Sequence, residues 1–393
     1  MPNQSTATQD TPDRVRVLRD GRRQSKHRRS TRCATFTERL AHDVRTPLAV
    51  IQEYASLMSE GLMGAVTDEQ QRALEVIADR ACDLNRTIDN AVDASKLMTR
   101  LHRVWRSRCR VSDLVARVRP QLLRKAALKR VDLQFSAIGK PLEIQCEKET
   151  VARAIANIVC ATLNLVQNDC QMLVSEESEC GAKEAGIRIN VEGANQTTLA
   201  QLQELWEFKP SERSSRPRRM CELSVAAELI DRNLGRLEMF TSDLGGIALW
   251  IGFPFAEPVE LLRRHLLRAM RLHPGSQRVS LFRAEVRESI HDDLSGSLNS
   301  VFNSLVGQND LAVDLDPRRW LLTIAHQEMT VDRLHRRLER RREAVNLRRL
   351  GRPLPRILLQ SDGSWQLPND LDRILSAVGH WVERRTPTAA RTE

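Results

Sequence analysis

Aromatic residues are scarce in this sequence, and no long hydrophobic run occurs. Phe, Trp and Tyr together make up 4% of its 393 residues, with a single tyrosine, so its cores must rest on Leu, Val, Ile and Ala. A membrane-spanning helix needs a run of about 18 or more apolar residues, and the sequence has none. Residues 1–20 are polar and charged, which excludes a secretory signal peptide. Together these absences predict a cytoplasmic protein.

Closely spaced cysteines are also absent. The eight cysteines are scattered, without a Cys-x-x-Cys pair, at Cys33, Cys82, Cys109, Cys146, Cys160, Cys170, Cys180 and Cys221. Such pairs are typical of zinc sites and thiol redox motifs. We therefore expect no metal centre and no disulfides, and we expect the reduced thiols of a cytosolic protein.

Positive charge is concentrated in two segments, within a formal net charge of +10. Residues 1–32 hold nine Lys and Arg against three Asp, and residues 333–349 hold eight Arg against two Glu. A basic tail binds nucleic acid or an anionic membrane, or it is a solvated, disordered leader. Because no aromatic residues interrupt the N-terminal charges, and no nucleic-acid-binding motif follows, we predict a disordered tail over residues 1–35 and no nucleic-acid binding.

Apolar residues become periodic from about Thr37 onward. They first recur at steps of three and four, the spacing of one helix face, at Leu40, Val44, Leu48, Ile51, Ala55 and Met58. Gly61 and Gly64 end this predicted helix, and Thr67 with Gln70 forms a capping box at the start of a second. The second helix repeats these steps at Leu74, Ile77, Ala81, Leu84, Ile88, Ala91, Ser95 and Met98.

An alternation of three and four is the seam of a coiled coil. We therefore predict a helical hairpin over residues 36–100 that forms a homodimer, in which two hairpins make a four-helix bundle. The alternative is that the seam packs against later domains of the same chain, and we favour the homodimer.

One histidine of the first predicted helix lies off this seam. His42 is rotated by about 200° from Leu40 around the helix axis, so it faces solvent, and Thr46, one turn later, shares its face. Asp43 beside it is able to hold a proton on one imidazole nitrogen, which leaves the lone pair of the other nitrogen free for nucleophilic attack. Pro47 removes a backbone N–H and bends the helix just past these groups. An exposed histidine alone is usually a plain surface residue, but this combination indicates a site.

Three stretches resemble the dimerisation and phosphoacceptor domain of two-component sensor histidine kinases, over residues 36–100. They are His42-Asp43-Val44-Arg45-Thr46-Pro47-Leu48, the bend Glu60-Gly61-Leu62-Met63-Gly64 with Glu69-Gln70, and Asp93-Ala94-Ser95-Lys96. The resemblance implies phosphorylation of the His42 imidazole, general-base catalysis by Asp43 and a phosphatase role for Thr46. It also implies a response regulator as the partner.

Helix and strand patterns then follow in the order that this family has for its ATP-binding α/β sandwich, over residues 105–256. Helices are predicted over 111–129, 148–165 and 223–234, and strands over 131–135, 142–144, 187–191, 236–240 and 247–253. The resemblance implies ATP and Mg²⁺ as cofactors.

The expected ATP-binding residues depart from the family's pattern at three places. On the long helix, Asn157 matches the first residue of an Asn-x-x-x-Asn pair, but Ala161 replaces the asparagine that binds Mg²⁺. The adenine-binding Asp-x-Gly-x-Gly is replaced by residues 193–197, which contain no acid. The glycine-rich phosphate turn is replaced by residues 220–224, all of which carry a β-carbon. These losses predict a pseudokinase with weak or absent ATP-dependent autophosphorylation, and the alternative is a divergent but working site with its motifs elsewhere.

The rest of the chain is predicted as a linker helix over residues 257–276, a third unit over residues 277–382 and a tail over residues 383–393. The strand–helix–hairpin–helix–strand order of the third unit is the ferredoxin-like pattern. It weakly resembles a diguanylate-cyclase-type (GGDEF) domain, but residues 316–320 stand where the signature hairpin would be. We expect a non-catalytic docking domain.

The predicted fold is thus an α+β multidomain protein with a helical hairpin, an ATPase-like α/β sandwich and a ferredoxin-like domain. Two functions stay open. In the first, His42 is phosphorylated and exchanges phosphate with a response-regulator aspartate, the phosphate coming from ATP, from a partner kinase or from the regulator itself. In the alternative, the chain is a non-catalytic dimeric scaffold that docks signalling partners.

Overall fold

The computed structural model divides the chain into two units, residues 1–102 and residues 103–393. It describes residues 12–98, 104–179, 181, 183–193, 197, 200–201, 218–241, 246–275, 277–288, 292–307, 309–325, 329–349 and 351–383. The first unit is helical and the second holds two α/β sheet domains, which confirms the predicted α+β class. None of the helices in the described ranges is long and apolar enough to cross a membrane.

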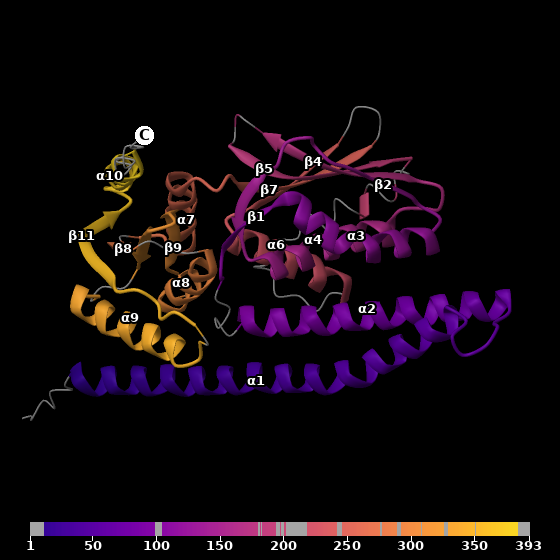
Figure 1. Ribbon diagram of the computed structural model, residues 1–393, viewed down its shortest axis with the longest axis horizontal. Coiled ribbons are helices and arrows are strands. Elements are labelled where there is room, and N and C mark those ends of the chain that lie inside the picture. The colour runs from indigo at the N-terminus through magenta and orange to yellow at the C-terminus, as the bar shows by residue number, and fades with distance from the viewer. Residues whose placement is uncertain are drawn as a thin grey trace, which may run out of the picture. The chain divides into compact units, whose positions relative to one another are not determined.

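The first unit is a hairpin of two long helices, α1 (Pro12–Ser59) and α2 (Asp68–Met98) (Figure 1). Gly61 ends α1 with a φ of 73°, and the Leu62 N–H returns to the Leu57 carbonyl at 3.0 Å, as in a Schellman cap. The predicted capping box starts α2: the Thr67 N–H donates to Gln70 Oε1 at 2.9 Å, and the Gln70 N–H donates to Thr67 Oγ1 at 3.3 Å.

The helix α1 begins much earlier than the sequence predicts. Residues 12–35 are helical, so the prediction of a disordered tail is wrong for them, while residues 1–11 lie outside the described part of the chain. Eight of these 24 residues are Arg, a good helix former, and no proline occurs between Pro12 and Pro47. Helix propensity alone thus favours continuation of α1, although no apolar periodicity marks it.

The predicted apolar seam is only half covered within one hairpin. Seam residues buried between α1 and α2 include Leu48, Ala55, Leu74 and Ala81. Six other seam residues are exposed, together with Tyr54: Leu40, Ile51, Met58, Ile77, Leu84 and Ala91. A single hairpin therefore leaves an apolar stripe uncovered on both helices.

In its described residues, the first sheet domain has seven strands and three helices. They are β1 (Ser107–Arg110), α3 (Val111–Leu128), β2 (Asp132–Ser136), β3 (Glu143–Cys146), α4 (Lys148–Leu165), β4 (Gln171–Glu179), β5 (Glu184–Glu192), α6 (Arg218–Arg232), β6 (Arg236–Thr241) and β7 (Ile247–Pro254). The strands form a five-stranded sheet in the order β2-β4-β5-β7-β6 and a separate two-stranded ladder of β1 and β3.

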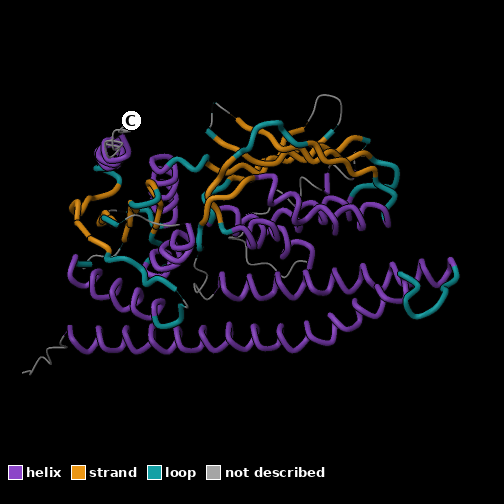
Figure 2. The backbone as a smooth tube through the Cα atoms, viewed as in Figure 1, coloured by secondary structure: helices purple, strands orange, loops and turns teal. Residues whose placement is uncertain are grey.

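The three helices α3, α4 and α6 lie on one face of the five-stranded sheet (Figures 1 and 2). The apolar residues between these helices and the sheet are buried, including Ile158 and Val159 of α4 and Ile187, Ile189 and Val191 of β5. Strands β1 and β4 are not among the predicted elements. The second half of β4, residues 175–179, contains three glutamates, so its composition does not indicate a strand.

The second sheet domain has the predicted order of elements. It comprises α7 (Pro258–Leu272), β8 (Gln277–Val286), α8 (Asp292–Leu305), β9 (Leu311–Asp316), β10 (Arg319–Ile324), α9 (Val331–Asn346), β11 (Ile357–Leu367) and α10 (Leu371–Glu383). Its sheet is antiparallel with the order β11-β8-β10-β9, in which the third strand lies between the first two, as in the split βαβ pattern. Residues 384–393, most of the predicted tail, lie outside the described part.

Both faces of this sheet are covered. Phe282 and Trp320 lie in a core with α8 and α9, whereas Leu281 and Leu321 lie in a second core with α7 and α10. The interpretation of residues 257–276 as a linker helix is wrong, because Leu262 of α7 belongs to that second core. The helix is rich in Arg, but its apolar stripe packs in that core.

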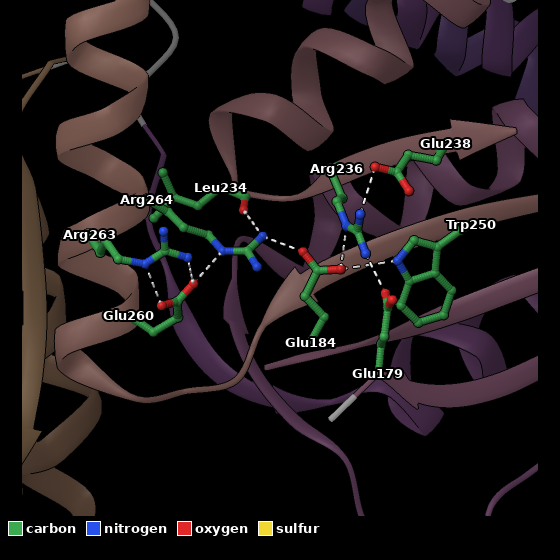
Figure 3. Close-up of polar contacts among 9 residues, drawn as sticks. All are labelled: Glu179, Glu184, Leu234, Arg236, Glu238, Trp250, Glu260, Arg263 and Arg264. Atoms are coloured by element: carbon green, nitrogen blue, oxygen red, sulfur yellow. Dashed lines mark hydrogen bonds and ion pairs between the residues drawn. The ribbon is translucent and has the colours of Figure 1, made fainter. Parts of the chain in front are cut away.

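Ion pairs join α7 to the first sheet domain. Glu184 of β5 is fully buried and pairs with Arg236 of β6 and with Arg264 of α7, both at 2.5 Å (Figure 3). Arg264 also pairs with Glu260 at 2.8 Å. The two sheet domains are thus connected by a charge network that is partly removed from water.

A buried histidine of α7 makes stability depend on pH. Burial, and then the charges of Arg106 and Arg268, lower the pKa of His265 from 6.5 to about 3. Below pH 6.5 the unfolded chain binds a proton that the folded chain does not, so this group makes the folded state less stable as the pH falls toward 3. The loss between pH 7 and pH 5 should be about 2 kcal/mol.

We expect His265→Leu to remove that part of the pH dependence. The measurement is urea unfolding of the full chain at pH 7 and pH 5, with His335→Gln on the exposed surface of α9 as the control. An unchanged difference between the two pH values in the leucine variant would show that His265 is already protonated in the folded state or that another group is responsible.

Candidate functional site

The candidate site lies on α1, where the His42 and Asp43 side chains are exposed. Their side chains are 83% and 78% exposed, and His42 Nδ1 lies 3.8 Å from Asp43 Oδ1. This distance is longer than a hydrogen bond, but a small rotation of either side chain would close it. The imidazole is therefore accessible to a large partner, and a carboxylate lies beside one of its two nitrogens.

Thr46 lies one turn further along α1 on the same face. Its Oγ1 donates to the His42 backbone carbonyl at 3.3 Å, a bond that holds the hydroxyl close to the histidine. The predicted grouping of His42, Asp43 and Thr46 is thus present in the structure as one exposed cluster.

Two ion pairs, one within this cluster and one a turn before it, link α1 to α2. Arg45 pairs with Asp89, and Glu38 pairs with Lys96 at 3.0 Å. Arg45 belongs to the motif around the histidine, but its partner is 44 residues away in sequence, so no sequence signal identifies Asp89. These pairs orient the His42 face relative to the second helix.

Pro47 lies inside α1. Proline has no N–H, so the Asp43 carbonyl, four residues earlier, loses its usual helical partner. The helix α1 is bent rather than straight, as expected for a helix with an internal proline (Figure 1).

The residues compared with an ATP site in the sequence lie on α4 and at the end of β5. Asn157 is only 1% exposed within α4, and Ala161, one turn later, has no oxygen to offer to Mg²⁺. Gly193 keeps a positive φ of 77°, but Glu192 before it is exposed, whereas adenine recognition needs an acid inside a pocket. Of the four residues, only Asn157 and Glu192 have a side-chain oxygen.

The segment that replaces the glycine-rich turn is helical. Residues 220–224 lie within α6, which starts at Arg218, and from Glu222 onward the backbone N–H groups are used within the helix. A phosphate-binding loop needs such groups to point at the ligand. Nowhere in the described chain do three or more His, Cys, Asp or Glu side chains group as a metal site.

A family comparison identifies the hairpin. Residues 34–100 match the family model of the His Kinase A (phospho-acceptor) domain. This match confirms the predicted phosphoacceptor hairpin and covers the His42 cluster, while the individual roles of His42, Asp43 and Thr46 remain predictions. No curated protein matches the chain.

Several solved structures are weakly similar to the chain. The catalytic domain of the histidine kinase ThkA shares 12% identity over 38% of this chain and 97% of its own, with a TM-score of 0.32. The Acinetobacter baumannii histidine kinase AdeS shares 12% identity over 55% of this chain and 98% of its own, with a TM-score of 0.34. Full-length ShkA in complex with AMPPNP shares 14% identity over 57% of this chain and 46% of its own, with a TM-score of 0.37.

Proposed function

We propose that this protein, whose hairpin is a histidine-kinase phosphoacceptor domain, is a two-component signalling protein of the sensor histidine kinase family. It is phosphorylated on His42 and exchanges that phosphate with an aspartate of a response regulator. The observation that carries the proposal is the exposed cluster of His42, Asp43 and Thr46 on a hairpin that matches the phosphoacceptor family.

The proposed chemistry uses the two nitrogens of one imidazole. Asp43 holds the proton on Nδ1, which leaves the Nε2 lone pair to attack phosphorus as the bond to the donor oxygen breaks. In the forward transfer, a regulator carboxylate attacks the same phosphorus and the N–P bond breaks. The Thr46 hydroxyl lies one turn away, where it would orient a water molecule that hydrolyses the regulator's acyl phosphate.

The proposal assigns weak or absent ATP-dependent autophosphorylation to this chain. Ala161, the helical segment 220–224 and the burial of Asn157 support it. The phosphate then comes from a partner kinase or from a phosphorylated regulator. Such a protein acts as a phosphotransfer protein or a phosphatase.

The homodimer is part of the same proposal. The exposed seam residues of α1 and α2 form an apolar stripe, and burying such a stripe is favourable. A second hairpin carries the same stripe, so a two-fold axis brings like surfaces together in a four-helix bundle.

The test is a two-part labelling experiment on the full chain. In the first part the chain is incubated with Mg²⁺ and ATP labelled on the γ-phosphate, and we expect no label on the protein. In the second part each response regulator of the source cell is labelled with acetyl phosphate and then mixed with the chain. We expect one regulator to lose its label, to His42 or to water.

Each outcome separates the alternatives. Label from ATP would contradict the pseudokinase assignment and leave the phosphoacceptor assignment intact. If the chain takes no label from ATP and no regulator loses its phosphate label, the non-catalytic dimeric scaffold is favoured.

A further inference from the structure

Two cysteines that are distant in sequence meet in the two-stranded ladder of β1 and β3. In this antiparallel pair Cys109 lies opposite Ile144, and Cys146 lies opposite Ser107. Their sulfur atoms are 3.4 Å apart, and the two residues are 5% and 0% exposed. Of the five cysteines whose thiols the structure describes, these two are the ones in sulfur–sulfur contact.

We propose that Cys109 and Cys146 form a modification site, at which a hydroperoxide reversibly converts the thiol pair into a disulfide. A disulfide bond is about 2.05 Å long, so the two sulfurs need to approach by little more than 1 Å. The ladder already holds the two strands in place. Because the two residues are diagonal neighbours in the ladder, closing this gap takes a shift of the two strands as well as rotation of the side chains.

The two thiols have different roles. The hydrogen bond from the Cys146 thiol lowers the pKa of Cys109, and Lys148 acts in the same direction. The same hydrogen bond, together with burial, raises the pKa of Cys146. Cys109 is also the less buried of the two, so we assign it as the thiolate that reacts first and Cys146 as the thiol that resolves the product.

The reaction balances with hydrogen peroxide as the oxidant. The Cys109 thiolate attacks one peroxide oxygen, the O–O bond breaks, and a sulfenic acid forms as hydroxide leaves and takes up the proton released by Cys109. The Cys146 sulfur then attacks the sulfenic sulfur, the S–O bond breaks, and the departing hydroxide takes the Cys146 proton. Two thiols and one peroxide yield one disulfide and two water molecules.

Burial slows but does not prevent this reaction. The ladder has two strands of four residues each, and beside it β3 is linked to the end of β7 by the single bridge between Ile144 and Phe255. Two-stranded ladders are the least stable form of sheet, so local opening exposes their residues without global unfolding.

The disulfide would strengthen a junction between the two sheet domains. Arg108 of β1 and Gln145 of β3 both bind Asp314 of β9, at 3.0 and 2.5 Å. Cross-linking the strands fixes the two donors relative to each other. It also closes a loop between residues 109 and 146, which stabilises the folded chain by restricting the unfolded one.

The experiment treats the reduced full chain with hydrogen peroxide, blocks the remaining thiols and maps peptides without reduction. We expect a cross-linked peptide that joins Cys109 to Cys146. Dithiothreitol should reverse this cross-link, and Cys109→Ala and Cys146→Ala should each abolish it. Cys170→Ala is the matched control, because Cys170 is equally buried but bonds to the Gly193 carbonyl. The unfolding temperature should rise by about 5 °C on oxidation in the wild type and not in Cys146→Ala.

The peptide map of the wild type decides the proposal even if a variant fails to fold. The proposal is overturned if Cys109 and Cys146 remain free thiols at peroxide concentrations that oxidise the half-buried Cys82. A cross-link between other cysteines, or between two chains, would overturn it as well.

Discussion

His42→Gln is expected to abolish phosphate transfer between this chain and its response regulator, with a loss of roughly 100-fold or more. Glutamine has similar polarity and supports the helix, but its amide nitrogen has no lone pair available for attack on phosphorus. Because the side chain is 83% exposed, the substitution should leave the hairpin folded. The measurement is transfer of labelled phosphate from the regulator to the chain, followed by its release in acid, to which an N–P bond is sensitive.

Three further variants control this result. His335→Gln changes an exposed histidine of α9 and should leave transfer unchanged. Asp43→Asn should slow transfer by roughly 100-fold, since the amide no longer holds the imidazole proton as a carboxylate does. Thr46→Ala should leave the His42 label intact and slow only the hydrolysis of the regulator's phosphate. Equal transfer by wild type and His42→Gln would place the phosphate elsewhere and refute the assignment.

Glu184→Ala is expected to destabilise the second unit by about 3–5 kcal/mol. The Glu184 carboxylate is fully buried and binds Arg236, Arg264 and the Trp250 indole N–H, the last at 3.1 Å (Figure 3). Removing it leaves the guanidinium of Arg264, whose side chain is 15% exposed, without this partner in a poorly hydrated site. A methyl group compensates for none of these interactions.

The backbone around Glu184 is shaped for this carboxylate. A β-carbon on Gly252 would collide with the Trp250 indole and would lie 2.6 Å from Glu184 Oε2, so glycine leaves room for both side chains. The site is therefore a specific pocket for an acid rather than a solvated ion pair.

Glu179→Ala is the matched control. Glu179 pairs with the same Arg236, but its side chain is 53% exposed. Exposed ion pairs contribute about 0–1 kcal/mol, so this variant should unfold almost as the wild type does. The measurement is urea unfolding of the full chain, followed by the fluorescence of its tryptophans. Equal urea midpoints of unfolding for Glu184→Ala and Glu179→Ala would show that the buried Glu184 does not stabilise the fold more than the exposed Glu179 does.

The sequence determined the features that depend on local periodicity and short motifs. The steps of three and four around Leu48 and Leu74 predict the hairpin, and Thr67 with Gln70 predicts the start of its second helix. The rotation of His42 away from the seam predicts an exposed imidazole, with Thr46 on its face. All of these follow from helix geometry over a few residues, which is why no knowledge of the fold is needed.

Features that depend on contacts between residues distant in sequence are seen only in the tertiary structure. The burial of Glu184, the pairing of Arg45 with Asp89 and the contact between Cys109 and Cys146 each join elements that no local pattern connects. The helix α7 packs in a core and is not a linker, because the strands that it covers come later in the sequence. Short-range sterics and periodicity fix helices and exposed motifs, whereas burial and pairing are set by which surfaces the whole chain brings together.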